Sequence, residues 1–237
     1  ESSWGEQART GRSALASITI LANLHQAFST TGYFALDSKT NPLLHVWSLS
    51  LEEQFYLVFP ILILVLLRKS DLRRTSRILV SLLAISLLLS IIHSYGLWPL
   101  SQWAPASEVS FYSPWTRSWE FLGGSLVALI PYKPGNERTS RGGLWVSLGG
   151  VGLLIASTLL LEEATTFPGI VALLPVLGTS LIIAGCTGSE VNVVRQGLSS
   201  RWMGWIGDRS YSIYLWHWPF VVFGQRQFPE VDNVRPV

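Results

Sequence analysis

The stretch NPLLHVWSLSLEEQFYLVFPILILVLL, residues 41–67, decides the fold. Its second half is continuously apolar, and the stretch as a whole exceeds the roughly 20 residues that a membrane-spanning helix needs. Its first half carries His45, Glu52 and Glu53, although a carboxylate at bilayer depth costs roughly 2.5–3.5 kcal/mol on insertion scales. Such residues usually face a bundle interior or a water-filled cavity. The stretch therefore predicts a membrane helix whose first turns carry a functional site.

The composition of the whole chain also indicates a membrane protein. Of the 237 residues, 49% are hydrophobic and only 14% are charged, whereas a soluble domain averages about 25% charged residues. Eleven tryptophans fit membrane–water interfaces, where an amphipathic ring is favoured. The net charge of +2 is too small to indicate a nucleic-acid partner, and the single cysteine, Cys186, excludes an intrachain disulfide and a cysteine-based metal site. We expect no metal site and no nucleic-acid partner.

Apolar segments recur along the chain and predict an all-α, polytopic bundle of about seven spanning helices. No internal repeat or low-complexity tract divides the chain, so we expect residues 1–237 to form one partial membrane domain. The expected segments are 13–28, 43–67, 78–97, 115–130, 144–161, 170–186 and 205–223.

The charges of the connecting loops support this division. Lys and Arg gather before the first segment and after the second, fourth and sixth. In contrast, residues 98–114 contain no basic residue, and residues 162–169 contain only acidic charges. Because short cytoplasmic loops are enriched in Lys and Arg, we expect the N-terminal end of the chain in the cytoplasm and the C-terminal end outside it.

The polar residues of the opening stretch follow helical spacing. Ser48, Glu52 and Tyr56 recur every fourth residue, and His45 lies seven residues before Glu52, so all four fall on one face. A polar stripe beside a Leu/Val/Ile surface is typical of a cavity lining. Glu53 points elsewhere. The alternative interpretation is that both glutamates are interfacial charges that reach water.

Two further segments combine polar and apolar residues in the same way. Arg117 and Glu120 are three residues apart, which allows an ion pair on one helical face. Near the end of the chain, one face carries Ser210, Tyr214 and His217. The alternatives are a surface ion pair for the first segment and an interfacial anchor for His217 beside two tryptophans.

Together these stretches resemble the membrane-bound acyltransferase 3 family. The similar segments are NPLLHVWSLSLEEQFYLVFP, FYSPWTRSWEFLGG and IGDRSYSIYLWHWPF, in the order usual for the family. FPGIVALLPVLGTSLIIAG is also similar to the subgroup that carries an extracytoplasmic SGNH-hydrolase-like domain after the membrane part. The resemblance runs from about residue 11 to residue 220, which is nearly the whole chain.

The resemblance implies a multi-pass enzyme of the bacterial inner membrane. Such an enzyme moves an acyl group, with acetyl expected, from a CoA thioester to a hydroxyl of a cell-envelope carbohydrate such as lipopolysaccharide or peptidoglycan. Membrane lipid, acyl-CoA and the carbohydrate are then the partners, with acyl-CoA as donor substrate and no bound cofactor. Glu52 corresponds to the carboxylate of the family signature, in a supporting or positioning role. The expected substrate-binding residues are Trp47, Ser48, Gln54, Tyr56, Arg117, Glu120, Tyr211, Ser212, Tyr214 and His217.

One feature of the family pattern is missing. The family's catalytic histidine pair is ten residues apart on an early helix, and the histidines at 25, 45, 93 and 217 do not reproduce that spacing. We therefore expect an interior fragment that lacks the family's general base and the SGNH-like domain and is inactive alone. His45 is the alternative base. It lies seven residues, or about 10.5 Å along a helix, from Glu52, too far for a direct hydrogen bond.

Two other classes of function stay open at this stage. A polytopic transporter or lipid-carrier flippase could place an acidic site in its core, but such carriers often show paired half-repeats, and the sequence has none. A non-catalytic membrane scaffold is the third class. CoA-dependent acyl transfer to a cell-envelope sugar by the full-length protein would distinguish the enzyme from both.

Overall fold

The computed structural model is helical throughout the part of the chain that it describes, which comprises residues 3–28, 40–97, 106–130, 137–162, 165–187 and 192–228. This confirms the expected all-α class. The helices, in chain order, are α1 (Ser3–Ile18), α2 (Ala22–Ala27), α4 (Val46–Lys69), α5 (Leu72–Ser94), α6 (Ala106–Tyr112), α7 (Pro114–Ala128), α8 (Glu137–Leu160), α9 (Leu173–Cys186), α10 (Val193–Leu198) and α11 (Arg201–Gln227).

Three helices are long and apolar enough to cross a membrane. They are α4, α5 and the part of α8 from Arg141 to Leu160, and α9 is a shorter apolar helix. The other expected segments also coincide with helices, but these are shorter or less apolar. The helix α7 has 15 residues, and α11 has 27 residues with many polar side chains among them. The bundle is thus polytopic by its three apolar helices, and the count of seven spans stays a prediction.

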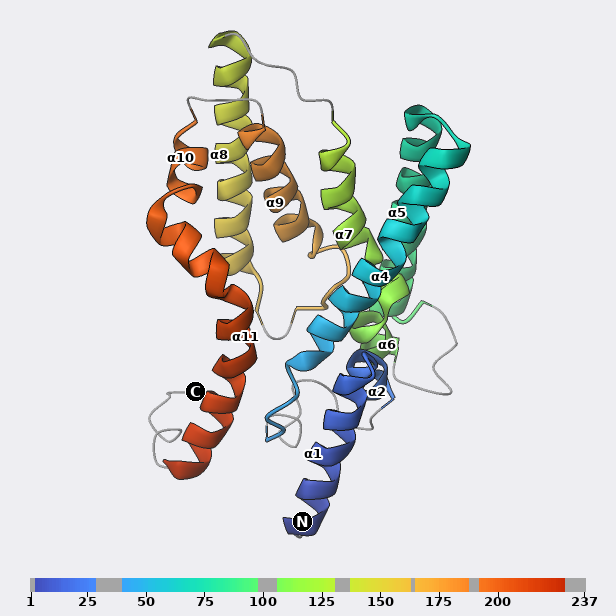
Figure 1. The fold of residues 1–237 in the computed structure, drawn as a ribbon, viewed down its shortest axis with the longest axis vertical. Helices are drawn as coiled ribbons and strands as arrows, with labels where there is room; N and C mark the ends of the chain where they lie inside the picture. Colours follow the sequence, from blue (N-terminus) through green and yellow to red (C-terminus); the bar gives the residue numbers. More distant parts are fainter. Residues whose placement is uncertain are drawn as a thin grey trace.

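The ends of the helices sort into two groups (Figure 1). The helices α4 and α5 form an antiparallel hairpin whose turn lies at the upper end, together with the start of α8 and with α10. These are the helix ends that carry basic residues such as Arg68, Arg141 and Arg195. The start of α4, the helix α6 and the end of α11 lie at the lower end. Most of the basic connections therefore share one end of the bundle, as their alternation along the sequence requires.

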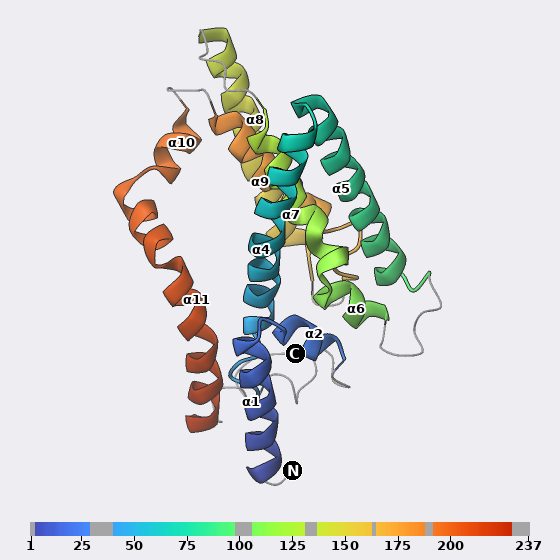
Figure 2. The ribbon, with the colours of Figure 1, turned by 45° about the vertical axis from the view of Figure 1, so that its right-hand side comes forward.

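The first expected segment differs from this pattern. It is divided into α1 and α2 by a turn at Ile20, whose φ of 60° is in the left-handed region. The side-chain amide of Gln54 donates a 2.6 Å hydrogen bond to the Ile20 carbonyl and holds this turn against α4. The amino end of α1 lies at the lower end in all views (Figures 1 and 2), so α1 brings Arg9 and Arg12 away from the other basic connections.

Glycines bring α8 and α9 into close contact. A Cβ at Gly150 would lie 2.5 Å from the carbonyl oxygen of Gly178, and one at Gly185 would lie 2.6 Å from the Ser147 backbone nitrogen. Small residues allow this approach in membrane bundles, where packing replaces the hydrophobic effect. The side-chain amide of the buried Asn192 donates to the Ser147 hydroxyl and to the Gly185 carbonyl, both at 3.0 Å. The pair α8–α9 is therefore a fixed part of the scaffold.

Candidate functional site

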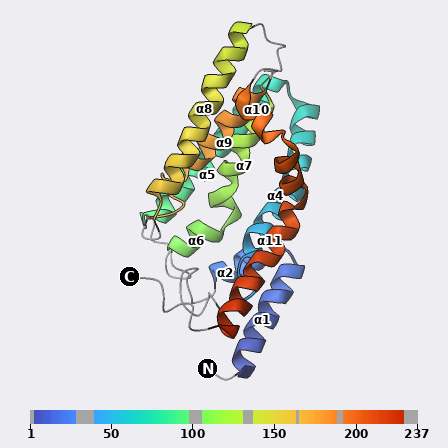
Figure 3. The same ribbon diagram turned by 90° about the vertical axis from the view of Figure 1, so that its left-hand side faces the viewer.

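The start of α4 lies beside α11 (Figure 3), and polar side chains join the two helices. The Tyr214 hydroxyl donates a 2.9 Å hydrogen bond to the His45 carbonyl, and its oxygen is 2.5 Å from the Ser48 hydroxyl. The Trp218 indole N–H donates to the Asn41 carbonyl at 2.9 Å. Residues that are more than 160 positions apart in the sequence are thus joined at one junction, which we call the α4–α11 junction.

His45 is the most enclosed side chain of the junction. It lies immediately before α4, is only 4% exposed, and its ring centroid is 5.4 Å from those of both Tyr214 and His217. Neither ring nitrogen makes a hydrogen bond of normal geometry within the described residues. Burial lowers the pKa of His45, and the nearby His217 lowers it further, against smaller opposing effects of the Leu215 and Pro42 backbone groups, whose contacts with the ring are too long or too bent to be normal hydrogen bonds. The lowered pKa favours the neutral imidazole, which can accept one hydrogen bond and donate another.

The two glutamates of α4 have different surroundings. Glu52 is half-buried one helical turn after Ser48, whereas Glu53 is exposed. Tyr56, one turn further along the expected stripe, is 63% exposed. The stripe is therefore enclosed only at its first three positions, beside α11. Two further residues expected to bind substrate, Tyr211 and Ser212, are exposed on α11 and lie outside the junction.

A second polar cluster surrounds Arg117 on α7. Its Nε is 2.7 Å from a Glu120 carboxylate oxygen, in an ion pair whose side chains are mostly buried. Its guanidinium carbon is 5.8 Å from the ring centroid of Trp47, 5.6 Å from that of Phe111 and 5.3 Å from that of Phe167. Aromatic rings at this distance attract a cation by their quadrupoles. The guanidinium is therefore held in a cage of three rings with one carboxylate.

The Arg117 cluster opens to a cavity and adjoins the α4–α11 junction. The ion pair lines a cavity of 330 Å³ between α7 and α9, together with the hydroxyls of Thr179 and Ser180. Trp47, which covers the guanidinium, directly precedes Ser48, which contacts Tyr214. The first turn of α4 therefore separates two polar sites, one on each side.

Gln54 belongs to a hydrogen-bond network that holds the helices together. Its side-chain amide donates to Asn23 Oδ1 at 2.9 Å and accepts from Asn23 Nδ2 at 3.2 Å. Asn23 also donates to the Tyr112 carbonyl at 3.1 Å. These contacts join α2, α4 and α6. Gln54 has its hydrogen-bonding groups occupied within the protein, in contrast to His45.

Asparagines are the residues that the sequence interpretation missed. Asn23 and Asn192 are fully buried, and Asn41 is almost so. Each connects separate elements by hydrogen bonds. The available signal was a lone asparagine inside or beside an apolar segment, because a buried amide must find partners. Among the described residues, no group of three or more His, Cys, Asp or Glu side chains is arranged to hold a metal ion.

The chain is similar in sequence to several known proteins. YrhL of Bacillus subtilis is 30% identical over 217 residues, which are 88% of this chain and 33% of that protein. The peptidoglycan O-acetyltransferase OatA of Listeria monocytogenes is 29% identical over 216 residues, with the same coverage. The O-acetyltransferase OatA of Staphylococcus aureus is 29% identical over 221 residues, which are 90% of this chain and 35% of that protein. The chain thus spans about a third of the length of these relatives. No solved structure matches it significantly.

The match to a protein family covers both polar sites. The family model described as an acyltransferase domain matches residues 13–234, which include the α4–α11 junction and the Arg117 cluster. With three apolar helices of spanning length and this match over nearly all of its residues, the chain belongs to the membrane-bound acyltransferase 3 family.

Proposed function

We propose that the full-length protein is an integral-membrane O-acyltransferase and that the α4–α11 junction is where the acceptor hydroxyl is held for reaction. The observation that carries this proposal is His45, a buried imidazole with no normal hydrogen bond within the described residues. Buried polar groups are almost always hydrogen-bonded, so a buried group without a partner is suited to a substrate. The family and the names of its relatives supply the reaction class.

The proposed reaction is the transfer of an acetyl group from acetyl-CoA to a sugar hydroxyl. The hydroxyl oxygen attacks the thioester carbonyl carbon, the carbon–sulfur bond breaks, an ester forms, and CoA leaves as its thiol after taking up the proton that the hydroxyl gives up. His45 hydrogen-bonds the hydroxyl in this scheme. Glu52, one turn from Ser48, supports the arrangement by its charge. The Ser48–Tyr214 contact fixes the two helices on which the site is built.

The acceptor that we propose is a cell-envelope carbohydrate, with peptidoglycan as the first candidate because a relative is named a peptidoglycan O-acetyltransferase. The Arg117 cluster is suited to this class of ligand. Its guanidinium and the Ser180 hydroxyl can donate hydrogen bonds to sugar or carbonyl oxygens inside the 330 Å³ cavity. The Thr179 hydroxyl, which donates to the Pro175 carbonyl, can accept a hydrogen bond from a sugar hydroxyl. Tyr56, Tyr211 and Ser212 lie outside both sites, and we assign them no contact with the reacting groups.

The proposed setting is the bacterial inner membrane, with the basic connections at one end of the bundle in the cytoplasm and the end of α11 outside. The amino end of α1 then lies on the outer side, in contrast to the cytoplasmic position expected from the loop charges. Under this orientation His45 lies at the outer end of α4, where an envelope sugar is accessible. We expect residues 1–237 expressed alone to be inactive, because none of their four histidines reproduces the spacing of the family's catalytic pair.

The test is an acetyl-transfer assay with the full-length protein in proteoliposomes. Radiolabelled acetyl-CoA is supplied, and label on purified glycan strands is measured with and without the protein. We expect label to accumulate on sugar hydroxyls as base-labile ester. Absence of any CoA-dependent transfer to peptidoglycan or another envelope carbohydrate, with the protein folded and inserted, would contradict the proposal and favour a transporter or a scaffold.

A further inference from the structure

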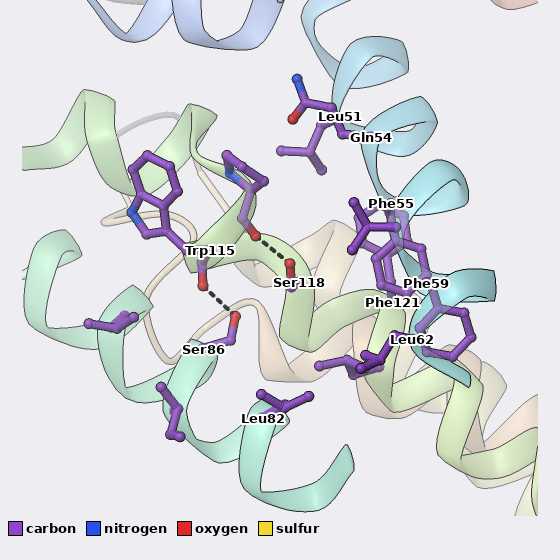
Figure 4. A pocket seen from close by; sticks show the side chains of 15 residues that line it. Leu51, Gln54, Phe55, Phe59, Leu62, Leu82, Ser86, Trp115, Ser118 and Phe121 are labelled. Atoms are coloured by element: carbon purple, nitrogen blue, oxygen red, sulfur yellow. Dashed lines mark hydrogen bonds between the residues drawn. The ribbon is translucent and has the colours of Figure 1, made fainter. Parts of the chain in front are cut away.

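A second, larger cavity lies on a different face of α4 from the α4–α11 junction (Figure 4). It has a volume of 470 Å³ and is enclosed by α4, α5 and α7. The rings of Phe55 and Phe59 stack at 4.7 Å, and Phe55 stacks on Phe121 at the same distance, so three rings form one wall. Leu82 on α5 lies on the opposite side of the cavity. The wall is mainly apolar, and its polar members are Gln54, Ser86 and Ser118.

The polar groups that line this cavity are occupied by the protein itself. The Ser86 hydroxyl donates to the Trp115 carbonyl at 2.6 Å and accepts from the Trp119 backbone N–H at 3.0 Å. The Ser118 hydroxyl donates to the Pro114 carbonyl at 2.5 Å (Figure 4). A cavity holds water only if it offers a water molecule two to four polar partners. Because the Ser86 and Ser118 hydroxyls are already hydrogen-bonded, they offer a water molecule few partners. The cavity therefore favours an apolar occupant.

The cavity borders the part of the protein surface that faces lipid. Its lining includes Val58 on α4 and Ile85 on α5, both of which are largely exposed. Both helices are long and apolar enough to cross a membrane. The medium next to the exposed edge of the cavity is therefore hydrocarbon. An opening into hydrocarbon, with an apolar wall, admits a hydrocarbon chain without loss of hydration.

The shape of the wall favours a lipid chain over another helix. Helices in membranes associate through small residues, and α8 and α9 do so in this protein through Gly150 and Gly178. The small residues in the lining of the cavity between α4, α5 and α7 are Ser86 and Ser118, whose hydroxyls are already hydrogen-bonded within α5 and α7. Most of the other lining residues have large aliphatic or aromatic side chains. Bulky walls hold the helices apart and leave a space for a flexible chain instead of a helix surface.

We propose that this cavity binds an acyl chain of a membrane phospholipid. A volume of 470 Å³ lies within the roughly 300–1,000 Å³ of small-ligand pockets. The lipid chain fills the gap between α4 and the α5–α7 pair and stabilises the position of α4, whose first turn lies between the two polar sites. The proposal does not depend on the acyl-transfer reaction, because it concerns a bound lipid and not a substrate.

The test is photocrosslinking in a membrane of defined composition. The full-length protein is reconstituted in phosphatidylglycerol nanodiscs that contain a small fraction of phosphatidylglycerol with a diazirine on one acyl chain, and labelled residues are identified by mass spectrometry. Because a pocket buries about 70–90% of its ligand, we expect labelling of lining residues such as Leu62 and Leu89 to exceed that of exposed residues outside it by about fivefold. Equal labelling of lining and exposed residues would overturn the proposal.

Matched variants test the same point independently. Val58→Trp fills the cavity from α4, whereas Leu57→Trp adds the same ring to an exposed neighbour outside it. We expect Val58→Trp to reduce labelling at Leu89 about fivefold and Leu57→Trp to leave it unchanged. Equal effects of both, or crosslinks from the lining to a second copy or to another segment of the chain, would contradict the proposal. If Val58→Trp does not fold, Leu89→Trp with its control Leu88→Trp, read at Leu62, gives the same comparison.

Discussion

The pair α8–α9 and the junction between α4 and α11 are held together in different ways. The first pair packs backbone against backbone at Gly150 and Gly185 and is fastened by the buried amide of Asn192. The second is joined by side-chain hydrogen bonds of Tyr214 and Trp218, and much of α11 is exposed. One interface is filled, whereas the other leaves polar groups such as His45 free for another molecule.

This difference in packing indicates that the α8–α9 pair maintains the fold and that the α4–α11 junction is the part suited to binding a substrate. A close-packed pair tolerates little change, since an added methyl group has no space to occupy. A junction built from a few hydrogen bonds can admit a substrate between α4 and α11 while the two helices keep their positions relative to each other. Substitutions in α8–α9 should therefore affect folding, and substitutions in the α4–α11 junction should affect activity in a protein that still folds.

The largest effect is expected at the glycine contact. Gly150→Leu would place its Cβ 2.5 Å from the Gly178 carbonyl oxygen, and overpacking of this kind costs about 1–3 kcal/mol or more. We expect most of the full-length protein to be lost from the folded, detergent-extractable fraction, as measured by size-exclusion chromatography. Gly152→Leu is the control, because nothing lies within 4 Å of its Cβ position. Equal yields for both would show that α8 and α9 are not packed as described.

The next largest effect is expected at Glu52. Glu52→Gln keeps the size of the side chain and removes its charge from the half-buried turn beside Ser48. We expect the acetyl-transfer rate of the full-length protein to fall by about a hundredfold or more, within the range of a catalytic group, at normal expression. Glu53→Gln, on the exposed face, should change the rate little. Similar losses from both variants would contradict the assignment of Glu52 to the junction.

A smaller effect is expected at Tyr214. Tyr214→Phe removes the contacts with the Ser48 hydroxyl and the His45 carbonyl, and loss of hydrogen bonds to groups that stay buried costs about 1–3 kcal/mol. We expect the transfer rate to fall by about tenfold, with a small decrease in thermal stability measured by fluorescence. Tyr211→Phe, at a 57% exposed position, should leave both quantities unchanged. A larger loss from Tyr211→Phe than from Tyr214→Phe would place the site elsewhere on α11.

Helical periodicity predicted part of this arrangement. It placed Ser48 and Glu52 on one face of α4, and it placed Tyr214 and His217 together near the end of the chain. The spacing of Arg117 and Glu120 correctly allowed their ion pair. Helical spacing relates residues within a few turns of one another, so it predicts which residues share the polar face of a helix.

The partner of each face could not be predicted, because it depends on contacts far apart in the sequence. No local pattern indicates that α11 lies against the start of α4, or that Tyr56 points away from it. The turn at Ile20 could not be predicted either, because it contains no glycine or proline. It is stabilised by the hydrogen bond from Gln54 on α4 to the Ile20 carbonyl. The burial of His93, whose ring nitrogen lies 2.8 Å from the Leu89 carbonyl oxygen, likewise depends on the elements packed around α5.

The central claim is that His45 contacts the reacting groups, and the most direct measurement is the acetyl-transfer rate of His45→Ala in the full-length protein. We expect a loss of about a hundredfold, within the range for removing a hydrogen bond to a buried group, with unchanged insertion and folding. His25→Ala, on α2 and outside the junction, is the control and should keep the normal rate. A His45→Ala protein that transfers acetyl groups within about threefold of the normal rate would contradict the claim, because loss of a hydrogen bond to the buried reacting hydroxyl costs about 1–3 kcal/mol, which is more than a threefold change in rate.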